Sequence, residues 1–358
     1  MKVAIIGGGI IGLASAAELS RVGCEVTIYD INKESKEASW AAAGMLAPHN
    51  EAKSDDALWH LCQQSYQYWP TFLERFNLCK NEIDYRSKGC LTPYFKHENI
   101  EELMNKKTLL NKEKEVVVKL TKKECLAIEP LISDNIEGCF YMEGAQVNPR
   151  HVCTLLRDFC LKSGVQFKMG VEVQKVKEGS LILNEVNSEH YDQVVIAAGA
   201  WTPQLSRLVD KKIKGEPVKG QMLCFEVPEN FQLNSFIHSE HAYCVHRKDQ
   251  GLVIGSTMEM TGFDKAENEL SIEKLRDGAR EVLPILNDCH VKETWTGLRP
   301  KLENGYPCID RLNEFTVIAT GHFRNGILLT PVTALAVKQL VLRENLDVNL
   351  NDFSLASH

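Results

Sequence analysis

The first thirty residues alternate between apolar runs and glycine in a pattern that predicts a strand, a tight turn, a helix and a second strand. Residues 2–6 form a short apolar run rich in β-branched side chains, as in a strand buried on both faces. Good helix formers follow from Leu13 to Val22, and Gly23 is placed to end that helix. A second apolar run covers 25–29 and stops at Asp30. This order is that of a parallel βαβ unit.

The periodicity of the remaining chain predicts that both ends meet in one sheet. Apolar residues at helical spacing from Leu58 to Leu78 predict a helix in which Trp59 and Trp69 serve packing. A strand at 315–320, a glycine-containing loop and a helix at 327–342 repeat the order of the first unit. The other expected helices are 97–114, 149–162 and 271–283, and the other strands lie within 90–94, 115–120, 165–183, 193–199, 221–227, 241–246 and 251–257. A β-rich domain is therefore expected as an insertion between the two ends.

Composition narrows the class of protein. The chain has 358 residues, 44% of them hydrophobic and 25% charged, which is enough to bury a sizeable core. A formal net charge of -7 argues against a nucleic-acid or anionic membrane partner. The twelve cysteines show neither a C-x-x-C pair nor metal-ligand spacing, so we expect reduced thiols, a cytoplasmic protein and no metal. No apolar stretch is long enough for a membrane span, and three glycines interrupt what would otherwise resemble an N-terminal signal peptide.

The glycines at 7–12 fit G-x-G-x-x-G and indicate a dinucleotide site. Gly7 allows the tight turn, Gly9 lets the backbone approach a pyrophosphate, and Gly12 lets the helix pack on the strand. Amides near Ile10 and Ile11 then stand at a helix N-terminus, which attracts a dianion. Asp30 is placed to accept hydrogen bonds from a ribose and would repel a 2′-phosphate. The alternative is a structural glycine turn with a surface acid at the end of the strand.

A run of small residues at 38–48 has two interpretations. Its small side chains allow a large ligand to lie against the backbone. It also fits an alanine-rich helix start capped by Ser39. The pattern alone leaves both open.

Four blocks of the sequence resemble the flavin-dependent amine and D-amino-acid oxidases, and among these the glycine oxidases of thiamine biosynthesis. The resemblance covers almost the whole length. The four blocks are Gly7–Gly12, Ala41–Leu46, Gly297–Pro300 and Gly321–Leu329. It implies an α/β fold, with a Rossmann-like FAD-binding domain of the glutathione-reductase type and an inserted antiparallel β-rich substrate domain. The cofactor domain would comprise 1–83, 145–215 and 290–358, and the substrate domain 84–144 and 216–289.

The resemblance also implies the residues that hold non-covalent FAD. The glycine turn and the end of the second strand would hold the ADP half, the alanine run would cover the pyrophosphate and the ring, and the loop before the last helix would meet the flavin pyrimidine. The implied residues are Gly7, Gly9, Ile10, Ile11, Gly12, Asp30, Ile31, Ser39, Ala43, Gly44, Met45, Val176, His322, Phe323, Arg324, Asn325, Gly326, Ile327 and Leu328. Family members usually carry Glu where Asp30 stands.

Four residues are implied in substrate binding. Arg299 would pair with an amino-acid carboxylate through both guanidinium nitrogens, and Tyr243 would add a hydrogen bond. Arg324 and Met258 match positions beside the substrate. Taken alone, Arg299 also fits a surface or interdomain ion pair, and Met258 fits ordinary packing.

The implied reaction is oxidative deamination of glycine, sarcosine or D-alanine, with O2 as acceptor and ammonia and H2O2 as products. The imine or glyoxylate formed would supply thiamine biosynthesis, with a possible hand-off to a thiazole synthase, and relatives suggest a homotetramer. No acid–base side chain is expected to act in catalysis, because the flavin does the chemistry. The alternatives are oxidation of another small amino acid with a quinone acceptor, an NAD-dependent dehydrogenase, and a nucleotide-binding module without catalysis.

Overall fold

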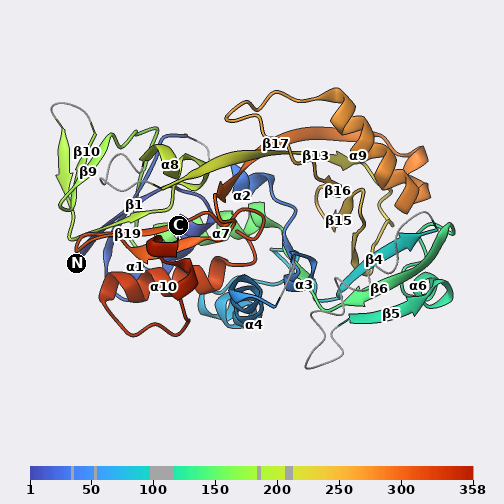
Figure 1. Cartoon of the computed structure of the whole chain (residues 1–358), viewed down its shortest axis with the longest axis horizontal. Helices are drawn as coiled ribbons and strands as arrows, with labels where there is room; N and C mark the ends of the chain where they lie inside the picture. The colour runs from blue at the N-terminus through green and yellow to red at the C-terminus, as the bar shows by residue number, and fades with distance from the viewer. Residues whose placement is uncertain (34–35, 52–54, 97–116, 184–186, 206–212, 358) are drawn as a thin grey trace.

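Two large β-sheets, each with its own helices, lie side by side along the long axis of the molecule (Figure 1). The computed structural model describes all of the chain except residues 34–35, 52–54, 97–116, 184–186, 206–212 and 358. The helix expected at 97–114 therefore lies outside the described residues. The predicted α/β class, with a Rossmann-like sheet and a separate β-rich sheet, is confirmed; two smaller sheets, β11-β10-β9 and β3-β7, complete it.

The first sheet has six strands in the order β18-β19-β12-β1-β2-β8, so the two ends of the chain do share one sheet, as predicted. Strand β1 lies in its middle, between β12 and β2, and pairs with both in parallel. Only β18 runs antiparallel to its neighbour. The strands are β1 (Lys2–Ile6), β2 (Glu25–Asp30), β8 (Gln166–Met169), β12 (Gln193–Ile196), β18 (Cys308–Arg311) and β19 (Thr316–Thr320).

Helices α1 (Ile10–Arg21), α4 (Ala57–Arg75), α7 (Pro149–Lys162) and α10 (Thr330–Leu342) share one apolar core with this sheet. Helix α1 is nearly all buried because it packs between α7 and α10. Asn148 caps α7 as expected, with its side chain accepting a hydrogen bond from the amide of Arg150. Trp69 is fully buried and donates to the carbonyl of Leu328 over 3.0 Å, which confirms its packing role.

The last helix begins later than the sequence suggested. We expected it to start at Ile327, but residues 326–329 form turns and α10 begins at Thr330. The Leu329 amide donates to the carbonyl of Asn325 and the Thr330 amide to that of Ile327, so the chain turns before the regular helix starts. The apolar pattern continues through this turn, which is why periodicity alone placed the boundary too early.

The second sheet has eight strands in the order β17-β13-β16-β15-β14-β4-β6-β5. Its strands β13 (Gly215–Phe225) and β17 (Val291–Leu302) are long and extend between the two halves of the molecule (Figure 1). We placed the residues of β17 in the cofactor domain, yet this strand pairs with β13 along its length. The domain boundaries themselves remain a prediction. The other strands are β4 (Cys90–Phe95), β5 (Val117–Thr121), β6 (Ile136–Met142), β14 (Phe236–His238), β15 (Tyr243–Arg247) and β16 (Gly251–Gly255).

Shorter elements complete the fold. Helix α9 (Glu269–Val282) packs against β13 and β16. The remaining elements are α2 (Ala38–Ala41), β3 (Met45–Leu46), α3 (Pro48–Glu51), α6 (Lys122–Ile128), β7 (Ala145–Gln146), β9 (Lys175–Lys177), β10 (Ser180–Ile182), β11 (Ser188–His190), η1 (Gly199–Trp201), α8 (Thr202–Leu205), η3 (Pro284–Asp288), η4 (Asn351–Phe353) and η5 (Leu355–Ser357). Among the residues described, no helix combines the length and the apolar character that crossing a membrane requires.

Candidate functional site

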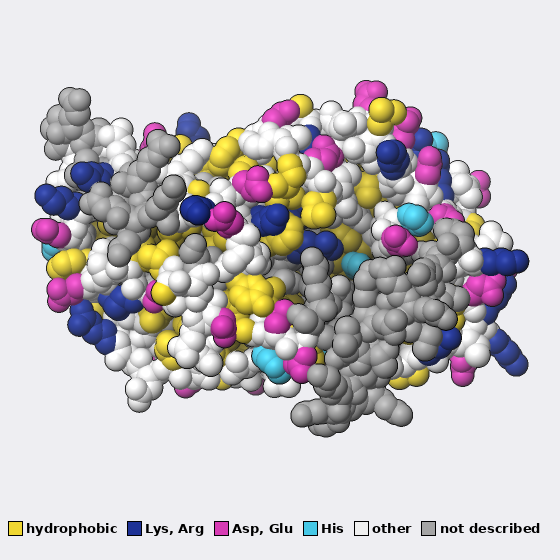
Figure 2. All heavy atoms as spheres, in the orientation of Figure 1, with side chains coloured by type: hydrophobic (Ala, Val, Ile, Leu, Met, Phe, Trp, Pro, Cys, Tyr) yellow, Lys and Arg dark blue, Asp and Glu magenta, His cyan; other side chains and the backbone are white. Residues whose placement is uncertain are grey.

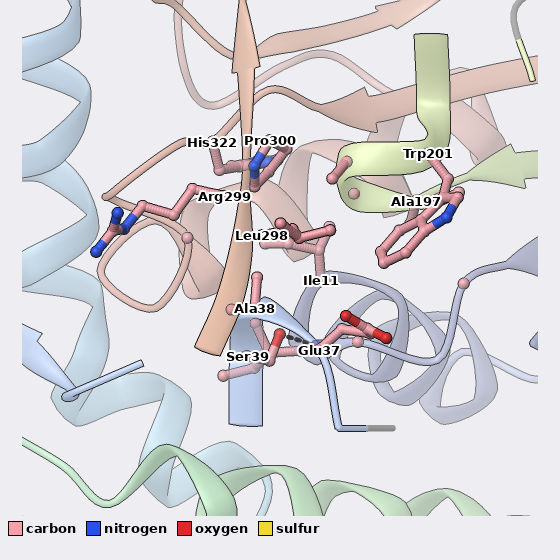
Figure 3. A pocket seen from close by; sticks show the side chains of 18 of the residues that line it. Ile11, Glu37, Ala38, Ser39, Ala197, Trp201, Leu298, Arg299, Pro300 and His322 are labelled. Carbon is pink, nitrogen blue, oxygen red and sulfur yellow. Dashed lines mark hydrogen bonds between the residues drawn. The ribbon is translucent and has the colours of Figure 1, made fainter. Parts of the chain in front are cut away.

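A cavity of about 420 Å³ is lined by residues from both sheets. The glycine turn, the end of β2 and the alanine run line one part of it, and β13, β17 and the loop before α10 line another. In the close view, Glu37, Ala38 and Ser39 face Leu298 and Pro300 of β17 across this space (Figure 3). The space-filling view shows hydrophobic side chains gathered near the middle of one face, together with a few charged ones (Figure 2).

The glycine turn is built for close backbone contact. A Cβ atom on Gly12 would lie 1.9 Å from the carbonyl oxygen of Gly7, so α1 can enter at this angle only with glycine there. Gly7 has a φ of +112° and likewise leaves no room for a side chain. Ile10 begins α1, and its amide donates to the Ser39 hydroxyl over 3.0 Å. Gly7, Gly9, Ile10 and Ile11 line the cavity, whereas Gly12 acts behind it through packing.

Asp30 is oriented by the backbone around it. The Gly8 amide donates to Oδ2 over 2.7 Å and the Asn32 amide to Oδ1 over 2.8 Å. Each carboxylate oxygen keeps acceptor capacity after these bonds. Both Asp30 and Ile31 line the cavity, at the end where a ribose is expected.

The alanine run is a wall of the cavity and not a helix capped by Ser39. Ser39 lies within the four-residue helix α2, whose N-cap is Glu37. The run lines the cavity from Ala41 to Met45. A Cβ atom on Gly44 would lie 1.9 Å from the carbonyl oxygen of Val147, so the chain here passes very close to its neighbour. The interpretation that a large ligand lies against this backbone is therefore the one that the structure supports.

Two arginines that do not line the cavity donate hydrogen bonds to backbone carbonyls of the alanine run. Arg247 is fully buried and donates through Nη2 to the carbonyls of Ala42 and Ala43, over 2.5 and 3.0 Å. Burial lowers the pKa of Arg247 to about 10. The Arg150 guanidinium lies 3.5 Å from the centre of the Trp40 ring, and its Nε donates to the Trp40 carbonyl. This cluster was not predicted, because no local motif connects its members.

The loop before α10 contributes a buried neutral imidazole. His322 lies 3.0 Å from the Thr333 hydroxyl through Nε2, and burial lowers the pKa of His322 to about 3. The Phe323 amide donates to the carbonyl of Pro300 over 2.9 Å, which joins the loop to β17. His322, Phe323, Arg324, Gly326 and Ile327 line the cavity.

Arg299 reaches from β17 across β13 toward the end of β16. Its Nη1 donates to the Thr257 carbonyl over 3.0 Å, and its Nη2 donates to the Ser256 hydroxyl over 2.6 Å. The guanidinium lies over Gly220, where a Cβ atom would come within 2.2 Å of Nη2. The partly buried cation therefore lies in a slot shaped by a missing side chain.

Tyr243 lines the same cavity on β15 and is 8% exposed. Its hydroxyl donates to the sulfur of Met222 over 3.0 Å. Arg324 is exposed and also lines the cavity. Met258 does not line it: its side chain is 62% exposed on the loop after β16.

Not every predicted cofactor residue reaches the cavity. Val176 is buried in β9, and Val171, Glu172 and Val173 line the wall in its place. Asn325 and Leu328 are also buried away from the lining. The sequence prediction missed the segment 197–201 that follows β12, although a buried strand ending in glycine signals such a position.

The residues present fit an elongated dinucleotide. A helix N-terminus, a carboxylate held for hydroxyl groups, and a wall of small residues follow one another around the cavity. No cysteine occurs among the described lining residues, and all twelve cysteines are free thiols. The described residues also contain no cluster of three or more side chains suited to hold a metal ion.

Comparison with known proteins agrees with this geometry. A family model described as "FAD dependent oxidoreductase" (DAO) matches residues 2–340. The chain therefore belongs to the DAO family of FAD-dependent oxidoreductases.

Within that family the chain is similar to glycine oxidases. It is 29% identical to the glycine oxidase of Pseudomonas aeruginosa, over 95% of this chain and 94% of that protein. The crystal structure of glycine oxidase from Geobacillus kaustophilus superimposes with a TM-score of 0.92 at 29% identity, covering 99% of this chain and 98% of that one. The bifunctional protein ThiO/ThiG of Trichormus variabilis is 32% identical over 98% of this chain. The chain spans about half the length of that relative, 54%.

Proposed function

We propose that this FAD-dependent oxidoreductase oxidises glycine and other small amines, such as sarcosine and D-alanine, to the imine. Ammonia and glyoxylate would follow by hydrolysis, and O2 would accept the electrons. The observation that carries the proposal is the position of Arg299, which lines the same cavity as the dinucleotide turn. The similarity to glycine oxidases supports it independently.

Each wall of the cavity has a defined task in this proposal. The amides at the start of α1 would bind the pyrophosphate, and Asp30 would accept hydrogen bonds from the ribose. The run Ala41–Met45 and residues 322–327 would enclose the isoalloxazine ring, which when bound supplies the two-electron acceptor. The turn that precedes α10 would lie at the pyrimidine edge, with the N-terminus of α10 following it.

Arg299 and Tyr243 would orient the substrate. A guanidinium binds a carboxylate through two parallel hydrogen bonds, so it fixes the direction of the amino acid as well as its charge. With the cofactor bound, the alanine wall would cover one side of the amine and limit its contact with water. No acid–base side chain is required, since orientation of a neutral amine is sufficient. The neutral state of His322 agrees with a role in packing rather than in proton transfer.

The cellular setting is also a proposal. Twelve free thiols favour a reducing compartment such as the cytoplasm. The fused relative ThiO/ThiG supports a hand-off of the product to a thiazole synthase. The homotetramer inferred by resemblance remains a prediction.

The test combines cofactor content with turnover. The purified protein is expected to be yellow, to release its flavin on acid precipitation, and to produce H2O2 with glycine. Parallel assays with sarcosine and D-alanine rank the substrates, and a quinone in place of O2 tests the alternative acceptor. A flavin-containing protein that oxidises none of these amines would refute the proposal.

Arg299→Ala tests the substrate anchor. We expect a rise in KM for glycine of about 100-fold or more, because charge-assisted bonds contribute roughly 1.5–3 kcal/mol each. Flavin content should stay unchanged. Arg276→Ala, which removes an arginine from surface ion pairs on α9, is the matched control. An unchanged KM in Arg299→Ala would remove Arg299 from substrate binding.

A further inference from the structure

The anchor Arg299 is held by a segment that is itself fixed by a buried ion pair. Lys219 Nζ lies 3.1 Å from Glu259 Oε2, and the Lys219 side chain is only 4% exposed. Their backbone amides and carbonyls also bond to each other in both directions. The Gln221 amide donates to the Thr257 hydroxyl over 2.9 Å. Residues 257–259 are therefore tied to β13, directly after Ser256.

Ser256 is the residue of this segment that reaches the cavity. Its hydroxyl oxygen accepts from Arg299 Nη2 over 2.6 Å, and the serine is neither fully buried nor fully exposed. Because the oxygen accepts a bond from a cation, the hydroxyl proton points elsewhere and the hydroxyl becomes a stronger donor. The hydrogen bonds described for this hydroxyl do not use that proton.

The position of Ser256 also brings it near Tyr243. The preceding residue, Gly255, pairs with Tyr243 across the sheet, and a Cβ atom there would lie 2.3 Å from the Tyr243 hydroxyl oxygen. Arg299 and Ser256 thus meet at the cavity wall, and Tyr243, whose hydroxyl donates to Met222, lies beside them. A guanidinium and a hydroxyl donor side by side at the cavity wall suit an anion with two oxygens.

We propose that Ser256 is a further substrate-binding residue, whose hydroxyl donates to the substrate carboxylate beside Arg299. The inference rests on the proposed function, because it assumes that Arg299 binds a carboxylate. Ser256 then adds a donor to the anchor and takes part in selecting carboxylates over uncharged amines. Removing a hydrogen bond to a charged ligand weakens binding about 10- to 100-fold.

The experiment measures the Kd of acetate on the flavin-containing enzyme by calorimetry. Ser256→Ala is expected to raise this Kd at least about tenfold, while Ser256→Thr, which keeps the hydroxyl, stays within about threefold of the wild type. With glycine as substrate, Ser256→Ala should raise KM far more than it lowers kcat. Melting temperature and flavin content serve to show that the variants are folded.

The outcomes separate this inference from the proposed function. If Arg299→Ala abolishes acetate binding but Ser256→Ala leaves the Kd within twofold, the inference about Ser256 fails and the carboxylate anchor stands. If both Ser256→Ala and Ser256→Thr weaken binding equally, the hydroxyl is not the cause and the inference also fails. If Arg299→Ala has no effect either, the anchor itself is wrong and the proposed function loses its main support.

Discussion

Gly220→Ala is the sharpest test of how the substrate anchor is built. The guanidinium of Arg299 lies directly over Gly220, and an added Cβ atom would come within 2.2 Å of Nη2 and 2.4 Å of Cζ. Real contacts of this kind do not fall below 3.0 Å. The backbone of Gly220 has an ordinary φ that alanine can adopt, so the methyl group acts through Arg299 and not through backbone strain.

The expected magnitude follows from the bonds that Arg299 makes. Displacing the Arg299 guanidinium moves it out of the position set by Ser256 and Thr257. One or both of its bonds to a substrate carboxylate would then be lost. A charge-assisted hydrogen bond contributes about 1.5–3 kcal/mol, so kcat/KM for glycine should fall about 10- to 100-fold. The turn at Gly7–Gly12 is untouched, so flavin content should not change.

The assay is steady-state H2O2 production over a range of glycine concentrations, with flavin content and melting temperature recorded for each variant. Gly164→Asn is the control, since Gly164 follows α7, has a φ of +81° that asparagine tolerates, and has nothing within 4 Å of an added Cβ atom. If Gly220→Ala retained kcat/KM within threefold of the wild type, the slot would not position Arg299 and the reasoning would be refuted.

Two further variants test the surroundings of the cofactor. Arg247→Met leaves the carbonyls of Ala42 and Ala43 without their buried donor, so we expect the free energy of unfolding to fall by about 2–4 kcal/mol and FAD to bind more weakly. Urea titration measures the stability, and flavin release measures the binding of FAD. Unchanged values of both would contradict the supporting role of Arg247. His322 has a pKa of about 3 in the folded protein, below its value of about 6.5 when unfolded, so its contribution to stability is complete above pH 6.5 and is lost as the pH falls toward 3. Below pH 6.5 the free energy of unfolding of the wild type falls with decreasing pH, and His322→Asn should reduce this slope by about 1.4 kcal/mol per pH unit. Denaturant titration between pH 4.5 and 7 measures the slope for both proteins. Equal slopes would show that the imidazole is not kept neutral by burial.

The sequence predicted the parts of this molecule that local patterns encode. Strand β1, the glycine turn and α1 follow from residue types within thirty positions, and the return of β19 to the same sheet follows from a repeated order of elements. The position of Arg299 beside the dinucleotide turn came from resemblance to a family, and the structure brings both to one cavity.

What the sequence left out depends on contacts between distant segments. Arg247 meets the alanine run across about 200 positions of sequence, so periodicity gives no signal for it. By resemblance, the backbone of Val176 would contact the adenine; its side chain pairs across β9 and β10 into the core, Val173 lines the cavity, and the adenine contact stays a prediction. Met258 lies outside the cavity lining with 62% of its surface exposed, and sequence alone does not give the direction of a loop side chain, so its substrate contact stays a prediction.

The loop after β16 has one part that holds the substrate anchor and another part that is exposed to solvent. Its first two residues fasten Arg299, whereas Met258, Met260 and Phe263 project outward with more than a third of their surface exposed. Changes in side-chain volume at these outer positions would leave the charged head group untouched. Substitutions at Met258 or Met260, neither of which lines the cavity, are therefore expected to alter the outer surface of this loop while Arg299 keeps its position.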